Sequence, residues 1–198
     1  TAVSRPQYPR IEAILGFWFG EGSDAGPRPE WFSKTPDPGF DAEVRSRFLK
    51  DHELAASGEL GDWSEDPRGC LALLLLLDQF PRNMFRGTAR AYATDAEALR
   101  LADRAVSARM DEELPPVWRW FVYMPFMHAE DAAHQRRSVR LFLGLADEHP
   151  EAARILPCAL RHAEIVERFG RFPHRNGTLG RETTPGEAAF LGRPGSSF

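Results

Sequence analysis

The chain has 198 residues, of which 42% are hydrophobic and 27% are charged, enough apolar material for one compact domain over 1–198. Its formal net charge of −4 gives no basic footprint, so we expect no nucleic-acid partner. The longest apolar run, Leu71 to Leu77, is far too short to cross a bilayer, and Cys70 and Cys158 lack a second thiol at metal-site spacing. We therefore expect a cytoplasmic protein with free thiols and no membrane contact.

Apolar residues recur at helical spacing in the N-terminal part of the chain. The pattern predicts one helix over 10–20 and a second over 40–56. The intervening Gly- and Pro-rich loop contains two isolated aromatic residues, which we interpret as a candidate lid, Trp31 and Phe32.

Helix start signals mark the next two elements. Asp66 followed by Pro67 is typical of a helix N-terminus, and the helix that follows is apolar all round, so we expect it to be buried on every side. Thr94 and Glu97 have the spacing of a capping box ahead of an amphipathic helix.

Prolines divide the C-terminal half. We expect a helix over 117–148 that is kinked or restarted at Pro125, and another that opens at Pro150, kinks at Pro157 and stops at Gly170. A short helix should start at 184–187, and we expect 192–198 to be a loose tail.

No segment alternates between apolar and polar residues as a strand would. The fold class is therefore predicted to be all-α, an antiparallel array of about seven or eight helices.

One short motif occurs twice, as FPRN at 80–83 and FPHRN at 172–176. We expect each proline to stop its helix and each Arg-Asn pair to supply hydrogen-bond donors from a loop, with Arg86 and Arg181 following them. We interpret the two loops as two walls of one pocket.

Three predicted helices each place a titratable group on an apolar face: Asp78 in the third, His128 beside Gln135 and Asp131, and His162 in the last long helix. Burying such groups without partners costs several kcal/mol each, so they should pair or face a shared cavity. A satisfied hydrogen-bond network that fixes helix register is the structural alternative.

Such a cluster could support three chemistries. Two histidines and two carboxylates are metal-ligand types, but no metal-site spacing accompanies them, so we assign no metal ligand. A histidine oriented by Asp78 or Asp131 could act as a general base. Forked guanidinium donors could bind a carboxylate or phosphate, and this third possibility needs neither a nucleophile nor a metal-site spacing in the sequence.

The segments LLLDQFPRNMFRGTARAYATDAEAL, MPFMHAEDAAHQ and HAEIVERFGRFPHRNGTLGRETTPGEAAFL, with ILGFWFG near the start, resemble the bacterial family of unknown function numbered 924. The resemblance implies an all-α, tetratricopeptide-like superhelix and no known activity. Its motif residues, Glu130 among them, overlap the inward-facing set.

We therefore predict a pocket that binds a small anionic ligand, with acid/base catalysis as an extension. The predicted catalytic residues are His128, His162, Asp78 and Asp131. The predicted ligand-binding residues are Gln79, Arg82, Asn83, Arg86, Gln135, Arg168, Arg171, His174, Arg175, Asn176 and Arg181. A tetratricopeptide-like module for a protein or peptide partner, or a metal-dependent hydrolase, are the alternatives; the sequence specifies no cofactor and no oligomeric state.

Overall fold

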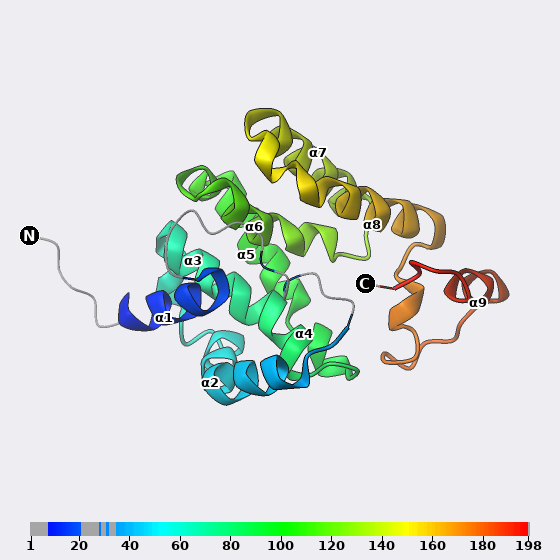
Figure 1. The fold of residues 1–198 in the computed structure, drawn as a ribbon, viewed down its shortest axis with the longest axis horizontal. Coiled ribbons are helices and arrows are strands. Elements are labelled where there is room, and N and C mark those ends of the chain that lie inside the picture. The colour runs from blue at the N-terminus through cyan, green and yellow to red at the C-terminus, as the bar shows by residue number, and fades with distance from the viewer. Residues whose placement is uncertain (1–7, 21–27, 29–30, 32–34, 198) are drawn as a thin grey trace, which may run out of the picture.

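The computed structural model describes residues 8–20, 28, 31 and 35–197, and within these ranges the chain is helical with no strand, which confirms the all-α prediction (Figure 1). The α-helices are α1 Tyr8–Phe19, α2 Pro38–Ala56, α3 Pro67–Leu74, α4 Phe80–Met84, α5 Asp95–Ser107, α6 Pro116–Met127, α7 Ala132–Glu148, α8 Leu156–Phe169 and α9 Pro185–Leu191. The short helical turns are η2 Gly61–Glu65, η3 Leu75–Gln79, η4 Ala89–Tyr92, η5 Met110–Glu113, η6 Pro150–Ile155 and η7 Pro173–Arg175.

The helices pack as a layered array. Helix α6 lies against α5 and α7, and α7 lies against α8, so neighbours in the chain are also neighbours in space (Figure 1). A tetratricopeptide-like superhelix stays a prediction. No helix in the described ranges is long and apolar enough to span a membrane.

The main core is rich in aromatic rings. Trp18 of α1 is 2% exposed and packs against Phe80 at 5.5 Å and Phe121 at 5.6 Å between ring centroids. Trp31 stacks on Trp18 and donates its Nε1–H to the Trp18 carbonyl, so it belongs to this core rather than to a lid. Phe32 lies outside the described residues.

Helix α3 begins as expected, since Asp66 accepts from the backbone N–H of Arg68 and Gly69. The prediction that Pro81 stops this helix is wrong. The chain continues from α3 through the π turn η3 into α4, and FPRN lies within that helical run rather than in a loop.

The helix can continue past Pro81 because side chains from other elements hydrogen-bond to the backbone carbonyls that the π turn and Pro81 leave without a helical partner. His52 Nδ1 lies 2.8 Å from the Leu76 oxygen, and the Thr94 hydroxyl donates to the Leu77 oxygen. The predicted capping box at Thr94 is therefore also wrong, because its hydroxyl is engaged with η3 and caps nothing in α5. Asp78 lies within this π turn and is 1% exposed.

The predicted helix over 117–148 is broken at 128–131 rather than at Pro125, which lies inside α6. Asp131 begins α7 as its N-cap, with its carboxylate 2.9 Å from the His134 nitrogen. Gln135 Nε2 donates to the carbonyls of Met127 and Ala129, both at 2.7 Å, and so fixes this turn. The break matters because it places His128 at the C-terminal end of α6, where it lines the pocket described below.

The C-terminal segment, residues 170–197, forms a small unit beside the main body (Figure 1). Gly170 ends α8 with φ 72°, a conformation that glycine adopts at little cost, as predicted. Thr184 and Glu187 form a complete capping box at the start of α9. Phe172 and Phe190 belong to a second, smaller hydrophobic cluster, which covers the end of α8.

Candidate functional site

A buried carboxylate–imidazole pair lies at the centre of the site. Asp78 Oδ1 is 2.7 Å from His128 Nδ1, and Asp78 Oδ2 accepts from Gln79 Nε2 at 2.6 Å. Because an ionised carboxylate only accepts hydrogen bonds, Nδ1 of His128 carries the proton and Nε2 keeps its lone pair. The same constellation orients general-base histidines in enzymes.

Burial and the surrounding charges set the protonation of this pair. Burial would raise the pKa of Asp78, but His128, Arg82 and the hydrogen bond from Gln79 hold that pKa well below its usual value. Burial lowers the pKa of His128, and Arg82 lowers it further, against the raising effect of Asp78. The pair is therefore an ionised aspartate with a neutral histidine at pH 7.

The two arginines of the repeated motif converge on one aspartate. Arg82 donates to both Asp95 oxygens, at 2.8 and 3.0 Å, and Arg175 Nη1 lies 3.5 Å from Asp95 Oδ2. Both guanidinium groups lie on the ring of Tyr92, at 5.5 Å for Arg82 and 4.5 Å for Arg175. The two motifs therefore meet at Asp95 and Tyr92, although Arg175 lines the pocket described below and Arg82 does not.

Arg175 is the more deeply buried of the two, with a side chain that is 8% exposed. It lies against the Phe172 ring at 4.7 Å and donates to the His128 carbonyl at 3.0 Å. Its buried Nε has no hydrogen-bond partner in the part of the chain that the structure describes. Burial and the Arg82 charge together lower the pKa of Arg175, a sign that its charge is incompletely compensated.

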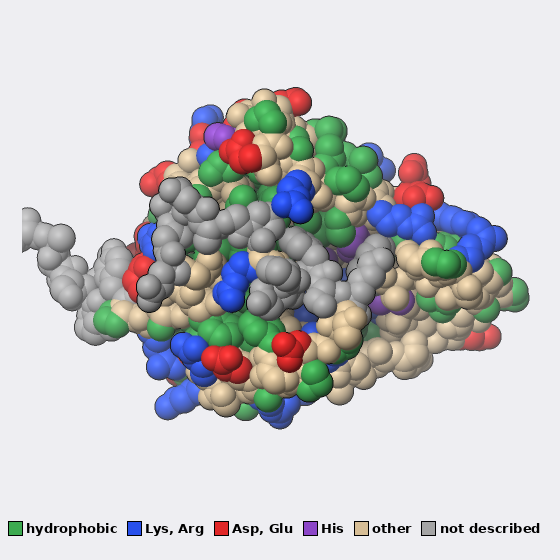
Figure 2. All heavy atoms as spheres, in the orientation of Figure 1, with side chains coloured by type: hydrophobic (Ala, Val, Ile, Leu, Met, Phe, Trp, Pro, Cys, Tyr) green, Lys and Arg blue, Asp and Glu red, His purple; other side chains and the backbone are tan. Residues whose placement is uncertain are grey.

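A pocket of about 420 Å³ opens beside this pair. Its polar lining consists of Asp95, His128, Glu130, Asp131, His134 and Arg175. Its other walls come from Ala89, Tyr92, Ala93, Ala96, Leu99, Pro125, Ala129 and Leu179. Histidine side chains are visible at the junction between the main body and the C-terminal segment (Figure 2).

His162 lies next to the pair but outside the pocket lining. Its ring centroid is 6.1 Å from that of His128, its Nδ1 is 2.8 Å from the Cys158 carbonyl, and the residue is 4% exposed. Burial, with a smaller contribution from the neighbouring His128, lowers the pKa of His162 to about 3. Burial also raises the pKa of the Cys158 thiol, so Cys158 is not an activated nucleophile.

The remaining predicted residues divide between a clasp at the pocket edge and contacts elsewhere. Arg181 donates to both oxygens of Glu130, at 2.6 and 2.9 Å, and the Phe172 nitrogen also donates to Glu130 at 2.7 Å. This clasp fastens the C-terminal segment to the turn that carries His128. His174 lies half-buried in η7, where burial lowers its pKa to about 4 with help from the Arg175 charge.

Arg171, one of the predicted ligand-binding residues, does not line the pocket. Its guanidinium pairs with both oxygens of Glu187, at 2.7 and 2.9 Å, and Asn176 Nδ2 donates to the same carboxylate at 3.1 Å. These contacts hold α9 in place within the C-terminal segment.

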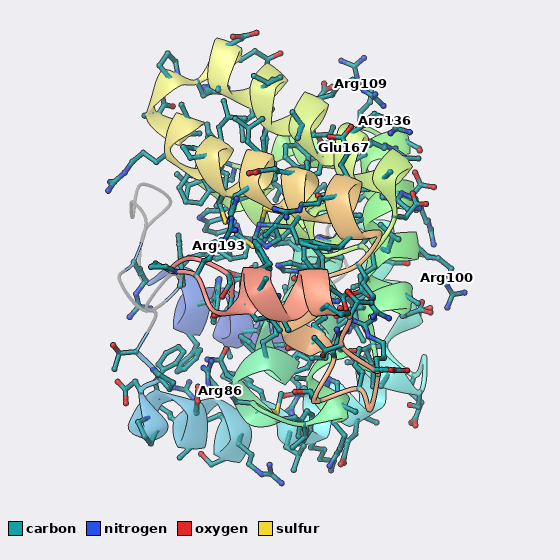
Figure 3. The ribbon with its side chains drawn as sticks, turned by 90° about the vertical axis from the view of Figure 1, so that its right-hand side faces the viewer. Arg86, Arg100, Arg109, Arg136, Glu167 and Arg193 are labelled. Atoms are coloured by element: carbon teal, nitrogen blue, oxygen red, sulfur yellow. The ribbon has the colours of Figure 1, made fainter. Side chains whose placement is uncertain are left out.

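Three further predicted residues lie away from the pocket lining. Asn83 and Arg86 both bind the carboxylate of Asp41 and so join α4 to α2, and Arg86 lies on the α2 side of the molecule (Figure 3). Arg168 is exposed on α8 with its guanidinium over the ring of Phe169.

The four predicted catalytic residues do not gather into a metal-ligand set. Among the described residues there is no group of three or more His, Cys, Asp and Glu side chains arranged to hold a metal ion. Asp131 in particular caps α7 at the surface instead of orienting a histidine.

Sequence reasoning missed two residues that shape the site, Asp95 and Tyr92. Asp95 lies inside the predicted helix start between Thr94 and Glu97, and Tyr92 carries no signal beyond its residue type. The only hint was their position, three and six residues before Ala98, the first buried residue of α5, and close to an arginine-rich motif.

Comparisons with known proteins agree with this architecture. The profile of the family described as "Bacterial protein of unknown function (DUF924)" matches residues 14–195. A solved structure of a protein of unknown function from Agrobacterium tumefaciens is similar, with 45% identity and a TM-score of 0.82 over 94% of this chain and 98% of that one. No curated protein matches the chain. The chain belongs to the DUF924 family of bacterial proteins of unknown function.

Proposed function

We propose that the pocket binds a small ligand through an acidic group, a carboxylate or phosphate, that meets Arg175. One observation supports this most: Arg175 lines the pocket, is buried, and must share Asp95 with Arg82, which already donates two hydrogen bonds to it. An anion would supply the missing counter-charge, and charged hydrogen bonds to a guanidinium are strong in a low-dielectric site.

The Asp78–His128 pair gives the same pocket a proton acceptor. Nε2 of a neutral His128 can accept a proton from a bound ligand, and Asp78 would stabilise the resulting imidazolium. Acid/base catalysis is thus an extension of the binding proposal. Asp131 and His162 have no such role in it, because the first caps α7 and the second is bonded to its own helix.

The two alternatives are less favoured. In the described ranges the large exposed hydrophobic side chains are Leu143 and Leu160, which is little apolar surface for a protein-interaction module. The site residues do not form a ligand set for a metal-dependent hydrolase.

Two free cysteines suit a reducing compartment, and we propose a cytoplasmic location.

A thermal-shift titration with phosphate and simple carboxylates tests the binding proposal. A ligand that binds the native state raises the melting temperature in a saturable manner. Arg175→Lys keeps the charge but loses the planar fork, so we expect about tenfold weaker binding. Arg168→Lys makes the same change on the exposed face of α8 and should have no effect. Equal responses from both variants, or no saturable shift with any anion, would contradict the proposal.

A further inference from the structure

The pocket lining contains charges of both signs. Arg175 contributes a buried cation, while Asp95, Glu130 and Asp131 contribute carboxylates. A purely anionic ligand would meet repulsion from these acids unless they are neutralised within the protein.

Two of the three carboxylates are neutralised in this way. Asp95 takes two hydrogen bonds from Arg82, and Glu130 takes two from Arg181. Asp131 differs from both.

Asp131 is exposed at the pocket edge, where its carboxylate accepts from the backbone nitrogen of His134 and forms no ion pair with a lysine or arginine of the described ranges. The pocket therefore has one incompletely compensated cation at Arg175. It also has one carboxylate, Asp131, that is stabilised by the backbone N–H groups of α7 and by the nearby His134 and Arg136 rather than by a direct ion pair.

His128 and Asp131 belong to the same four-residue turn between α6 and α7. The first offers the lone pair of Nε2 and the second an ionised oxygen, and both accept hydrogen bonds. An ammonium group has three N–H donors and no acceptor, so it is the group that this pair of acceptors complements.

The remaining walls are mostly apolar. Four alanines line them, together with larger side chains. Small side chains leave the space of the pocket to a ligand, and a volume of about 420 Å³ falls in the range of small-molecule sites. Besides the charged and histidine side chains, the pocket is lined by Ala89, Ala93, Ala96, Ala129, Leu99, Leu179, Pro125 and Tyr92.

We infer that the ligand is a free α-amino acid with an apolar side chain, whose carboxylate meets Arg175, whose ammonium group meets Asp131 and His128, and whose side chain lies against the alanine-rich wall. This inference rests on the proposed function, because it assigns the acidic group to Arg175. It adds the second charge and the apolar part.

Isothermal titration calorimetry on the whole chain at pH 7.5 separates these parts with three probes. L-Leucine carries both charges, 4-methylpentanoate lacks the amine, and L-leucinamide lacks the carboxylate. We expect leucine to bind at least about tenfold more tightly than either analogue, the effect of one charged contact.

Asp131→Asn removes the charge and keeps the helix cap, since asparagine caps as well as aspartate. It should weaken leucine binding about five-fold, the effect of one exposed ion pair, and leave 4-methylpentanoate unchanged. Asp147→Asn removes an exposed acid from the same helix and is the matched control, with no change expected for any probe.

The contrary outcomes are distinct. If 4-methylpentanoate binds as tightly as leucine, or if anions bind and leucine does not, the amino-acid inference is wrong and the proposed function stands. If leucinamide binds as tightly as leucine, the carboxylate is not recognised and both are wrong.

Discussion

Replacing Asp78 with asparagine is the perturbation that bears most on the interior of the site. The substitution keeps the size of the side chain and removes its charge. The 1% exposed carboxylate of Asp78 accepts from His128 at 2.7 Å and from Gln79 at 2.6 Å, and it lies 3.4 Å from Arg82 Nη1. An asparagine cannot accept from both neighbours with the same strength, because half of its amide is a donor.

The expected cost follows from these contacts. Removing one partner of a buried ion pair costs roughly 3–5 kcal/mol, and a charged hydrogen bond contributes roughly 1.5–3 kcal/mol. Because Arg82 keeps both hydrogen bonds to Asp95, the lower end applies. We expect Asp78→Asn to lower the free energy of unfolding by about 3 kcal/mol.

Urea unfolding at pH 7, followed by circular dichroism, measures this loss. The matched control is Asp103→Asn, which removes a half-exposed partner of Arg137 on α5 and should cost no more than about 0.5 kcal/mol. The folded-state pKa of Asp78 lies below its unfolded value, so its contribution is complete above about pH 4 and is lost as the pH falls below that. The wild type and the variant should therefore converge in acid, by about 1.4 kcal/mol per pH unit. A loss below about 1 kcal/mol at pH 7, or a difference that does not narrow in acid, would show that Asp78 is not a buried, ionised partner of His128.

Three other substitutions test separate parts of the structure. Gly69→Ala places a Cβ 2.3 Å from the Trp63 carbonyl oxygen and should lower the free energy of unfolding in urea by about 2–3 kcal/mol. Gly144→Ala is the control, since a Cβ there meets nothing within 4 Å, and it should raise the free energy of unfolding by up to about 1 kcal/mol. The pKa of His162 is about 3 in the folded state and about 6.5 in the unfolded state, so protonation favours unfolding and the free energy of unfolding should fall as the pH drops between these values. His162→Gln should flatten this part of the plot of unfolding free energy against pH. An unchanged plot would argue against burial of the neutral ring. Glu130→Gln should release the C-terminal segment, because it weakens the two hydrogen bonds from Arg181. Amide hydrogen exchange should then become faster in residues 170–197 and change little in the main body. An equal change in exchange in both parts would show that the clasp does not hold the segment in place.

Much of the fold could be predicted from local signals. The Asp66–Pro67 start of α3 and the Gly170 stop of α8 are local chemistry, in which a cap or a left-handed residue acts within one turn. The continuation through Pro81 could not be predicted, because it depends on His52 and Thr94, which are distant in sequence and satisfy the freed carbonyls.

The candidate site shows the same division. Helical spacing correctly placed Asp78 and His162 in the interior, since the stripe of a helix is a local property. It could not identify partners, so Arg171 was assigned to an anion although Glu187 already binds it. Asp131 illustrates the limit of residue type, because an aspartate near a histidine and an aspartate that caps a helix look alike in sequence.

The most direct test of the account is the nitrogen NMR spectrum of His128 with and without ligand. At pH 7 we predict a neutral ring protonated at Nδ1, and a saturable shift of Nε2 on addition of L-leucine, with His149 at the far end of α7 unaffected. A cationic His128 in the free protein, or a leucine titration that leaves its Nε2 resonance unmoved, would contradict the central claim that this nitrogen faces the ligand.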